Sequence, residues 1–543
     1  MVFARRSTTL LAAIIASCAM VLSLTACTSD NKTVVDGQTT VTSNSAGGVA
    51  VFTPSDGITL NQQTPLNKWA KLVHDLTKAL VDAGFKKGDI DHTTSDSLDK
   101  QSRAIQDFVV DHLSNNTTDD SGIAIAPDNM TLLVAPVVEA DASTRQYGDY
   151  VSQNLSTNDA TDEGATSDGE SSEDDSSKDD SSNTESDSTA SDEQAQAVDR
   201  LVSSLKLAKE SGMHVVLLGN SIEGYKPDAF VKFSDAQTIG KLQAEKMVSK
   251  LKLDKASKDN PKYIEVLLPY TAMDEKGNAN DSTFAQEAFR GIWQVLGSYY
   301  QKGVVESPSG TLDGKSTEND WQAVAYDAAK EGSTAKVLDK RLAKTDGQST
   351  LTRIDGIITM NDYIASEVVK ELDDLGYTGS AADINPQITI SGIVGNITGK
   401  KDLSRDAVPD PIKSPENDNA NDSSSSDDDA DKDTSASDKD RDSQWPLVTG
   451  YGAYVSNIPS IVNGKQWMTG MEDRQTIATD IAQACAKLNK DEALNSMPSI
   501  RNSEVGGVKK IPTINEPLLA VSAGNLKSAL IDPGYISLAD AGL

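Results

Sequence analysis

The sequence predicts an α/β protein with two doubly wound, parallel-sheet lobes, and two patterns lead to that prediction. Apolar runs of strand length alternate with amphipathic stretches of helix length, which is typical of parallel strands joined by crossover helices. Residues 130–138 and 214–218 are almost continuously apolar, as strands buried on both faces of a sheet are. The alternation starts again after residue 233, so a second, similar lobe is expected to follow the first.

The first lobe is expected to begin with a short apolar strand and to continue through alternating helices and strands. In residues 66–84, Trp69, Leu72 and Leu76 recur at helical spacing, and Gly84 is a good helix stop. The other elements expected here are helices at 102–113 and 197–212 and strands at 49–52, 130–138 and 214–218.

The rest of the chain is expected to repeat this order. The further elements that we expect are helices at 235–251, 283–300, 362–375 and 473–488, and strands at 263–268, 354–359 and 447–449. In open parallel sheets, ligands bind beyond the carboxyl ends of the strands. Two such lobes facing each other therefore predict a cleft between those ends.

The N-terminus has the pattern of an export signal. Two arginines precede the apolar stretch 10–24, which has signal-peptide length and is short for a membrane span. The stretch ends in the letters LTAC, the pattern of a bacterial lipobox, so residues 1–26 are interpreted as a lipoprotein signal peptide and Cys27 as the lipidated residue. Residues 27–48, polar and rich in Ser and Thr, are interpreted as a flexible tether. The alternative is an ordinary signal peptide with a chance cysteine.

The negative charge is concentrated in two inserts. The chain carries a formal net charge of −32, which argues against nucleic-acid binding because phosphate contacts need Lys and Arg. Residues 152–196 carry a net charge of −13 and residues 415–443 a net charge of −8. Both inserts have almost no apolar residues and are predicted to be disordered. Calcium chelation at 427–429 is the alternative to a solvated spacer, but the Gly and Glu of a calcium loop are missing.

Composition and motifs favour neither an enzyme nor a metal site. Cys485 is the only cysteine outside the signal and the lipobox, and as a lone thiol in an expected helix it is interpreted as a packed core residue. There is no His-Glu-x-x-His, no Gly-x-Ser-x-Gly and no phosphate-binding loop. We therefore expect no enzymatic activity, no cofactor and no metal. No metal-ligand spacing connects the histidines, which are His74, His92, His112 and His214.

Five stretches, in order, resemble the xylose- and multiple-sugar-binding proteins of the type I periplasmic-binding superfamily. The resemblance covers most of the chain from residue 49 to residue 543, outside the inserts. No single stretch is specific, and the evidence lies in their order. The stretches are 133–137, 228–244, 355–362, 448–466 and 507–535.

The resemblance implies a Venus-flytrap fold, in which two lobes are joined by a hinge of three crossing strands and a sugar sits between them. On this map, lobe 1 comprises 49–233 and 471–502, and lobe 2 comprises 234–470 and 503–543. It also implies a monomer, held at the outer face of the cell membrane by its lipid, that passes its solute to the permease subunits of an ABC transporter.

Five residues are candidates for ligand binding: Trp69, Asn220, Asn361, Asp362 and Tyr451. Asn361 and Asp362 follow an expected strand, where polar side chains project toward the cleft, but a helix N-cap has the same sequence pattern. Trp69 stands where the family has an Arg-Trp pair, and packing in its helix is the alternative. The resemblance places Asn220 and Tyr451 where the family has charged groups, Tyr-Asp-Arg and Gly-Gln-Asp.

The predicted function is therefore capture of a solute, by resemblance a sugar, for an ABC transporter. Two rivals stay open: a lipoprotein that closes on a ligand and engages a membrane sensor, and a non-binding surface scaffold whose cleft has decayed. The missing family charges favour an altered ligand or a lost one.

Overall fold

The computed structural model describes residues 34–35, 38–39, 46–56, 65–115, 126–138, 145–150, 153–156, 185–273, 280–343, 351–381 and 445–542. The chain divides into two compact units, Met1–Asn44 and Ser45–Leu543. In the first unit, β1 (Val34–Val35) pairs antiparallel with β2 (Gln38–Thr39). The second unit holds both predicted lobes and the candidate site.

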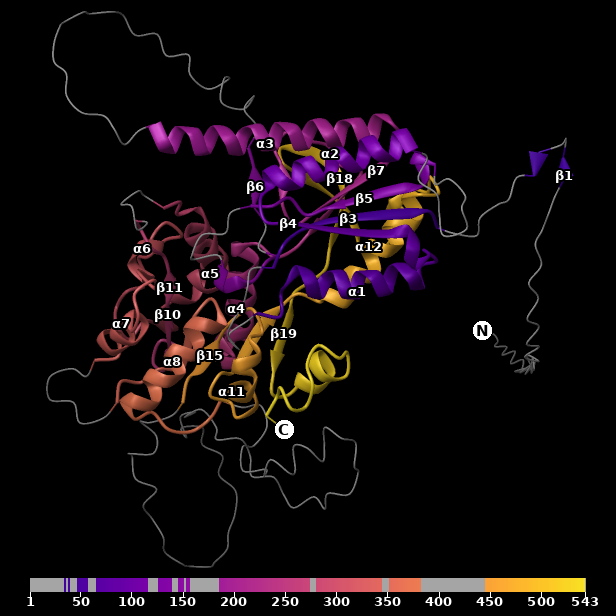
Figure 1. The fold of residues 1–543 in the computed structure, drawn as a ribbon. Helices are drawn as coiled ribbons and strands as arrows, with labels where there is room; N and C mark the ends of the chain where they lie inside the picture. Colours follow the sequence, from indigo (N-terminus) through magenta and orange to yellow (C-terminus); the bar gives the residue numbers. More distant parts are fainter. Residues whose placement is uncertain are drawn as a thin grey trace, which may run out of the picture. The chain divides into compact units, whose positions relative to one another are not determined.

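Within the described residues, the first lobe is built on a seven-stranded sheet in the order β17-β18-β9-β7-β5-β3-β4 (Figure 1). The strands from β9 to β4 run parallel to their neighbours, and β18 pairs parallel with β9 and antiparallel with β17. The strands are β3 (Gly48–Pro54), β4 (Ile90–Ser95), β5 (Met130–Val134), β7 (His214–Leu218), β9 (Ala229–Lys232), β17 (Ile500–Val505) and β18 (Val508–Asn515).

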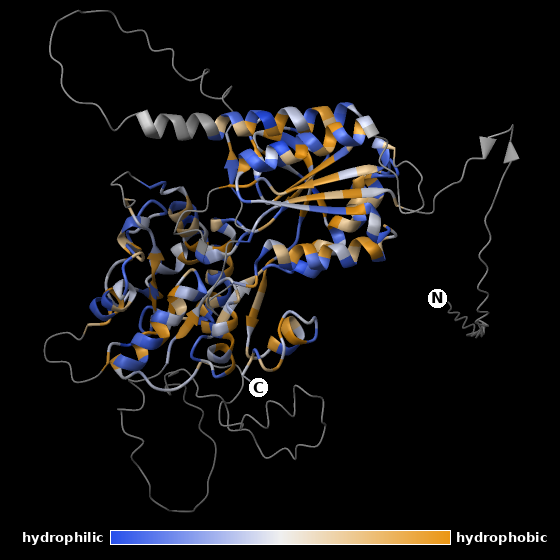
Figure 2. Cartoon of the chain, viewed as in Figure 1, coloured by the Kyte–Doolittle hydropathy of each residue, from blue (hydrophilic) through white to orange (hydrophobic). Residues whose placement is uncertain are grey.

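Helices cover both faces of this sheet. Alternate strand residues such as Val49 and Val51 pack with α1 (Trp69–Asp82) and α12 (Arg474–Leu488). The residues between them, such as Ala50, face α2 (Leu98–Asn115) and α3 (Glu185–Glu210). Figure 2 shows the apolar strands lying between these amphipathic helices. This period-two division of one strand between two cores explains the continuous apolar runs in the sequence.

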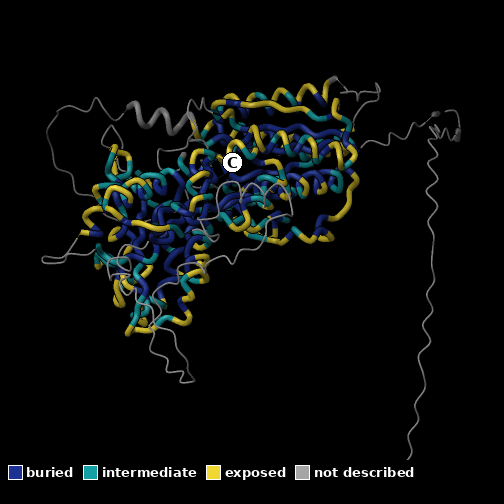
Figure 3. The backbone as a smooth tube through the Cα atoms, turned by 90° about the horizontal axis from the view of Figure 1, so that it is seen from below, coloured by how far each residue is buried: buried dark blue, intermediate teal, exposed yellow. Residues whose placement is uncertain are grey.

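The second lobe repeats the design on a smaller sheet. Among the described residues, four parallel strands lie in the order β12-β10-β14-β15, with α4 and α5 packed on one face and α7 and α8 on the other. Figure 3 shows a buried backbone at the centre of both lobes. The elements are β10 (Lys262–Val266), β12 (Val305–Glu306), β14 (Gly356–Ile358), β15 (Leu447–Thr449), α4 (Ala236–Leu251), α5 (Thr283–Gln301), α6 (Trp321–Val324), α7 (Ser333–Arg341), α8 (Asp362–Leu375) and α11 (Ile458–Val462).

Within the described residues, the chain passes between the lobes at three places. It leaves the first sheet from β9 into α4, returns from β16 (Met468–Met471) into α12, and leaves again from β18 into β19 (Leu519–Ser522). β16 and β19 pair antiparallel beside the second lobe. Two smaller pairs complete the fold: β6 (Asn154–Leu155) with β8 (Ser221–Ile222), and β11 (Leu268–Pro269) with β13 (Ala325–Tyr326).

The two-lobed α/β fold is confirmed, and two assignments differ from the sequence analysis. The hairpin of β17 and β18 extends the first sheet, although residues 503–543 were assigned to lobe 2. β4 was not expected at all, because this edge strand reads IDHTTS and has no apolar run. Period and hydropathy identify elements buried on both faces, whereas an edge strand or a hairpin can join either sheet.

The first acidic insert needs a correction. Residues 152–196 were expected to be disordered, but β6 lies in this stretch and α3 begins at Glu185. The packed part of α3, around Ala197 and Leu201, supplies the helix nucleus, from which the helix extends back to Glu185. The second insert at 415–443, the signal at 1–26 and Cys27 lie outside the described residues.

Two further expectations concern membrane spans and Cys485. In the part of the chain that the structure describes, no helix combines the length and the apolar character that crossing a membrane requires. Cys485 lies in α12 and is fully buried in the core of the first lobe, where burial raises the pKa of its thiol. It is a packed core residue, as the sequence indicated.

Candidate functional site

The candidate site lies beyond the carboxyl ends of two neighbouring strands of the second lobe. β14 ends at Ile358 and β15 at Thr449, and the strands pair in parallel register. The residues that follow turn sharply, since Met360 has φ +68° and Ala453 has φ +49°. Left-handed backbone at non-glycine residues is uncommon and clusters at functional sites.

The Asp362 carboxylate is held by three hydrogen-bond donors. Its carboxylate accepts hydrogen bonds from the Tyr454 N–H at 2.9 Å, the Gln466 amide at 2.7 Å and the Thr469 hydroxyl at 2.9 Å. Burial raises the pKa of Asp362 to about 6 in spite of these bonds. A Cβ at Gly450 would lie 2.1 Å from the carboxylate, so only glycine fits there. Asp362 therefore ties the turns of the second lobe together.

Asn361 serves two partners at once. Its Oδ1 accepts from the Ile364 N–H at 2.9 Å, which makes it the N-cap of α8. Its Nδ2 donates to Oε1 of Gln146 at 3.0 Å, a residue that follows a strand of the first lobe. The helix N-cap, which was the alternative to ligand binding, is present. The same side chain also bonds to a residue that follows a strand of the first lobe.

The Tyr451 hydroxyl is the centre of a buried network at the crossings. It accepts from the Asn67 amide at 3.0 Å, lies 2.5 Å from the Ser234 hydroxyl and donates to Oε1 of Glu472 at 3.3 Å. Glu472 also accepts from the Ser234 N–H at 2.7 Å. Burial raises the pKa of Glu472 to about 7. The network joins residues on two of the chain crossings.

Trp69 and Asn220 belong to the first lobe. The Trp69 ring meets Tyr150 and Phe233 edge to face, with centroid distances of 5.1 and 5.8 Å. Asn220 donates to the Pro136 carbonyl at 2.9 Å and accepts from the Gln153 N–H at 2.9 Å, so it joins two loops of its own lobe.

The structure links four of the five predicted residues through one another or through the segment 146–150, whereas Asn220 bonds to two loops of its own lobe. Trp69, Asn361 and Tyr451 each contact the segment 146–150, and the Asp362 N–H donates to the Tyr451 carbonyl at 2.9 Å. All five are at most 3% exposed.

Sequence reasoning missed the segment 146–150, which lies at the centre of this group. It contains two tyrosines and an aspartate just after the apolar run 130–138. Aromatic and acidic residues in the connection that follows a buried strand were the available signal, because ligands bind beyond the carboxyl ends of parallel strands. The sequence analysis assigned no role to this stretch, which lies between the apolar run 130–138 and the acidic insert that begins at residue 152.

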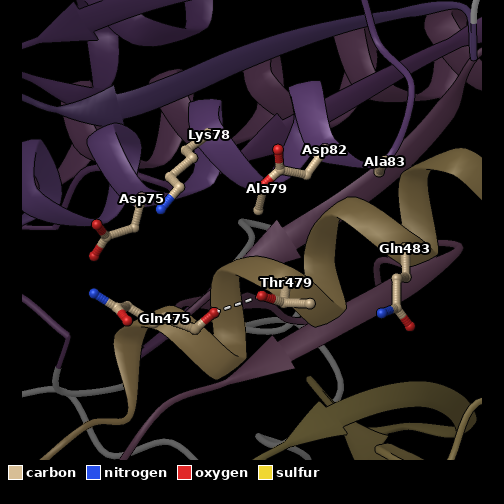
Figure 4. Close-up of a pocket in the computed structure, with 8 residues that line it drawn as sticks. All are labelled: Asp75, Lys78, Ala79, Asp82, Ala83, Gln475, Thr479 and Gln483. Carbon is tan, nitrogen blue, oxygen red and sulfur yellow. Dashed lines mark hydrogen bonds between the residues drawn. The ribbon is translucent and has the colours of Figure 1, made fainter. Parts of the chain in front are cut away.

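A separate pocket lies on the first lobe between α1 and α12 (Figure 4). It has a volume of about 400 Å³ and is lined by Asp75, Lys78, Ala79, Asp82, Ala83, Gln475, Thr479 and Gln483. Asp75 is paired there with Arg474 at 2.5 Å. None of the predicted site residues lines it.

No protein-family model and no curated protein sequence matches the chain. The chain is similar in structure to solute-binding proteins of ABC transporters. One, from Clostridium phytofermentans with bound β-D-glucose, is 17% identical with a TM-score of 0.45, and the match covers 91% of this chain and 99% of that one. A carbohydrate transporter solute-binding protein from Chloroflexus aurantiacus, in complex with D-glucose, is 17% identical with a TM-score of 0.43, covering 92% and 98%.

A third similar structure is the arabinose-binding protein AraP from Geobacillus stearothermophilus. It is 10% identical with a TM-score of 0.41, and the match covers 89% of this chain and 99% of that one.

Proposed function

We propose that this protein binds a polar solute, of the sugar class, between its lobes outside the cell and delivers it to an ABC transporter. The observation that carries the proposal is the meeting of polar and aromatic side chains between two parallel-sheet lobes joined by three crossings. Tyr451, Asn361 and Trp69 supply a hydroxyl, an amide and an aromatic face. Those are the groups that hold sugar hydroxyls and sugar C–H faces.

The proposal includes an attachment to the membrane. The lipobox at the N-terminus supports a lipid at Cys27, followed by the polar tether of residues 27–48. Two acyl chains bury enough CH₂ groups, at about 0.8 kcal/mol each, for stable anchoring. The two lobes, attached through this tether, can then reach the permease subunits while the protein stays at the membrane.

A panel of pentoses, hexoses and inositols tests the proposal on the full chain in detergent micelles. A solute that binds only the native state must raise the melting temperature, and it should give a saturable calorimetric titration with one site. Replacing Tyr451 with Phe removes one hydroxyl and keeps the ring, so affinity should fall about fivefold, as for one hydrogen bond worth ~1 kcal/mol.

The matched control is Tyr300→Phe. Tyr300 is also buried in the second lobe, and its hydroxyl donates to the Ile264 carbonyl at 2.9 Å, away from the crossings. It should leave affinity unchanged. Failure of every solute to bind at millimolar concentration would contradict the proposal.

One observation favours a second candidate function, that of a surface scaffold protein that binds no solute. The five predicted ligand residues are buried. Four of them make hydrogen bonds to protein through their polar side chains, and the Trp69 ring packs against two other aromatic rings. A cleft that is permanently filled in this way would make the protein a surface lipoprotein without a solute. The same titration separates the two functions.

A further inference from the structure

We propose that residues 146–150, called here the interlobe segment, occupy the candidate site in place of a solute. In this position the interlobe segment holds the two lobes together until a solute displaces it. The claim that a solute displaces the interlobe segment rests on the proposed function. The claim that the interlobe segment holds the lobes together does not, because it concerns contacts within the chain itself.

The interlobe segment makes ligand-like contacts with the second lobe. Tyr147 is fully buried among the core residues of that lobe, although it follows a strand of the first. Its ring lies 4.7 Å from the Phe284 ring and 6.3 Å from the Tyr451 ring. Gln146 accepts from the Asn361 amide at 3.0 Å through its side chain and from the Tyr454 hydroxyl at 2.8 Å through its carbonyl.

The other end of the interlobe segment is fixed to the first lobe. Asp149 pairs with Lys68 at 2.9 Å and accepts from the Trp69 N–H at 3.1 Å, at the start of α1, where a negative charge is favoured. Tyr150 stacks on Phe233 with a centroid distance of 4.9 Å and donates to the Lys68 carbonyl. One short stretch thus bonds to both lobes.

The groups that meet the interlobe segment are the groups that a solute would need. Asn361, Trp69 and Tyr451 were singled out as ligand contacts, and each instead contacts Gln146, Tyr150 or Tyr147. A segment attached to the chain is present at high effective concentration. A solute must therefore compete with it, and its apparent affinity is reduced by the fraction of molecules in which the site is filled.

Gly148 shows how closely the interlobe segment fits. It has φ +91°, and a Cβ there would lie 2.7 Å from Cβ and 2.8 Å from the carbonyl oxygen of Asn67. Both the backbone conformation and the space exclude other residues. Gly148→Ala should therefore push the interlobe segment out of place without opening a cavity in either core.

The test measures the distance between the lobes by pulsed electron spin resonance on the full chain in detergent micelles. Spin labels are attached at Asp107→Cys on α2 and Asp374→Cys on α8, which are exposed positions on different lobes. Cys18→Ala and Cys27→Ala leave only the buried Cys485 as a native thiol. Tyr147→Ala and Gly148→Ala are each compared with the otherwise unchanged chain.

The matched control is Tyr300→Ala, which removes a buried tyrosine from the same second-lobe core, where its hydroxyl donates to the Ile264 carbonyl and its ring stacks on Trp293. We expect a single short distance in the unchanged chain and in the control, and longer, broader distances in Tyr147→Ala and Gly148→Ala. In those two variants a sugar from the panel should restore the short distance and bind at least about tenfold more tightly than in the unchanged chain.

Each outcome decides something. Unchanged distances in a folded Gly148→Ala overturn the inference and leave the proposed function standing, even if Tyr147→Ala does not fold. Opening without any sugar binding supports the holding role and contradicts the proposed function. Equal sugar affinity in the opened variants and the unchanged chain overturns the claim that the interlobe segment competes for the site.

Discussion

At the scale of residues, two buried carboxyl groups near the chain crossings make the stability of the fold depend on pH. Burial raises the pKa of Asp362 to about 6 and that of Glu472 to about 7, so in the fold both groups favour the protonated form more than in the unfolded chain. Their stabilising contribution is complete below the unfolded pKa values and is lost as the pH rises through the folded ones.

Glu472→Gln should make the protein more stable above neutral pH. The neutral amide oxygen can still accept from Ser234 and Tyr451, but no charge has to be buried. The raised pKa corresponds to about 3 kcal/mol at pH 8, so the melting temperature of the unchanged protein should fall between pH 5 and pH 8 and that of Glu472→Gln should fall less. Thermal melts at both pH values check this, and parallel curves for the two proteins would contradict it.

Asn361 allows its two roles to be separated. Asn361→Ala removes the cap of α8 and the bond to Gln146, and should lower the free energy of unfolding by about 0.5–2 kcal/mol for the cap alone. Asn361→Ser keeps a capping oxygen and loses only the bond to Gln146. Denaturant melts should place Ser between Ala and the unchanged protein. Equal losses in both variants would show that the cap contributes nothing measurable.

At the scale of elements, hydrophobic period predicted most helices and six of the buried strands, but not β9, which lies between β18 and β7 in the first sheet. The strand His214–Leu218 and the helix Asp362–Leu375 lie where expected, because each has a continuous apolar run or a regular apolar face. β4 and the hairpin of β17 and β18 lack that signal and are fixed by pairing with distant strands. The candidate site shows the same difference. The polar residues at strand ends, Asn361, Asp362 and Tyr451, could be predicted from the sequence, and the interlobe segment could not.

The first acidic insert should respond to deletion in two different ways. Removing 157–184 leaves β6 and α3 in place and should change the melting temperature little, because this stretch is acidic and nearly without apolar residues. Removing 152–196 also takes away the buried Leu155 and the Gln153 partner of Asn220, and should lower the melting temperature by several degrees. Calorimetry of both deletions decides this, and equal melting temperatures would count against a structural role for β6.

At the scale of the whole molecule, three segments of the chain cross between two α/β lobes, and the proposed function adds export and a lipid anchor. The sequence pattern predicted the lobes because parallel sheets need apolar strands and crossover helices in alternation. It could not predict that the predicted ligand residues would be covered, because burial between lobes depends on which distant segment lies there. Gln146 and Asn361 are 215 positions apart in sequence.

Cys27→Ser should release the protein from the membrane. The variant keeps the apolar stretch 10–24 but loses the thiol that would carry the lipid. Cell fractionation should find it in the soluble extracytoplasmic fraction or in the medium, whereas Cys485→Ser, a matched change of a buried thiol, should stay with the membrane. Membrane association of Cys27→Ser equal to that of the unchanged chain would rule out the lipobox.

The central claim is that a solute binds between the lobes in place of residues 146–150, and calorimetric titration of three proteins with the same sugar tests it most directly. The account predicts one site per chain, with affinity highest in Tyr147→Ala, intermediate in the unchanged chain and lowest in Tyr451→Phe. Equal affinity in all three proteins would place the sugar elsewhere, and no binding in any of them would contradict the solute-binding function itself.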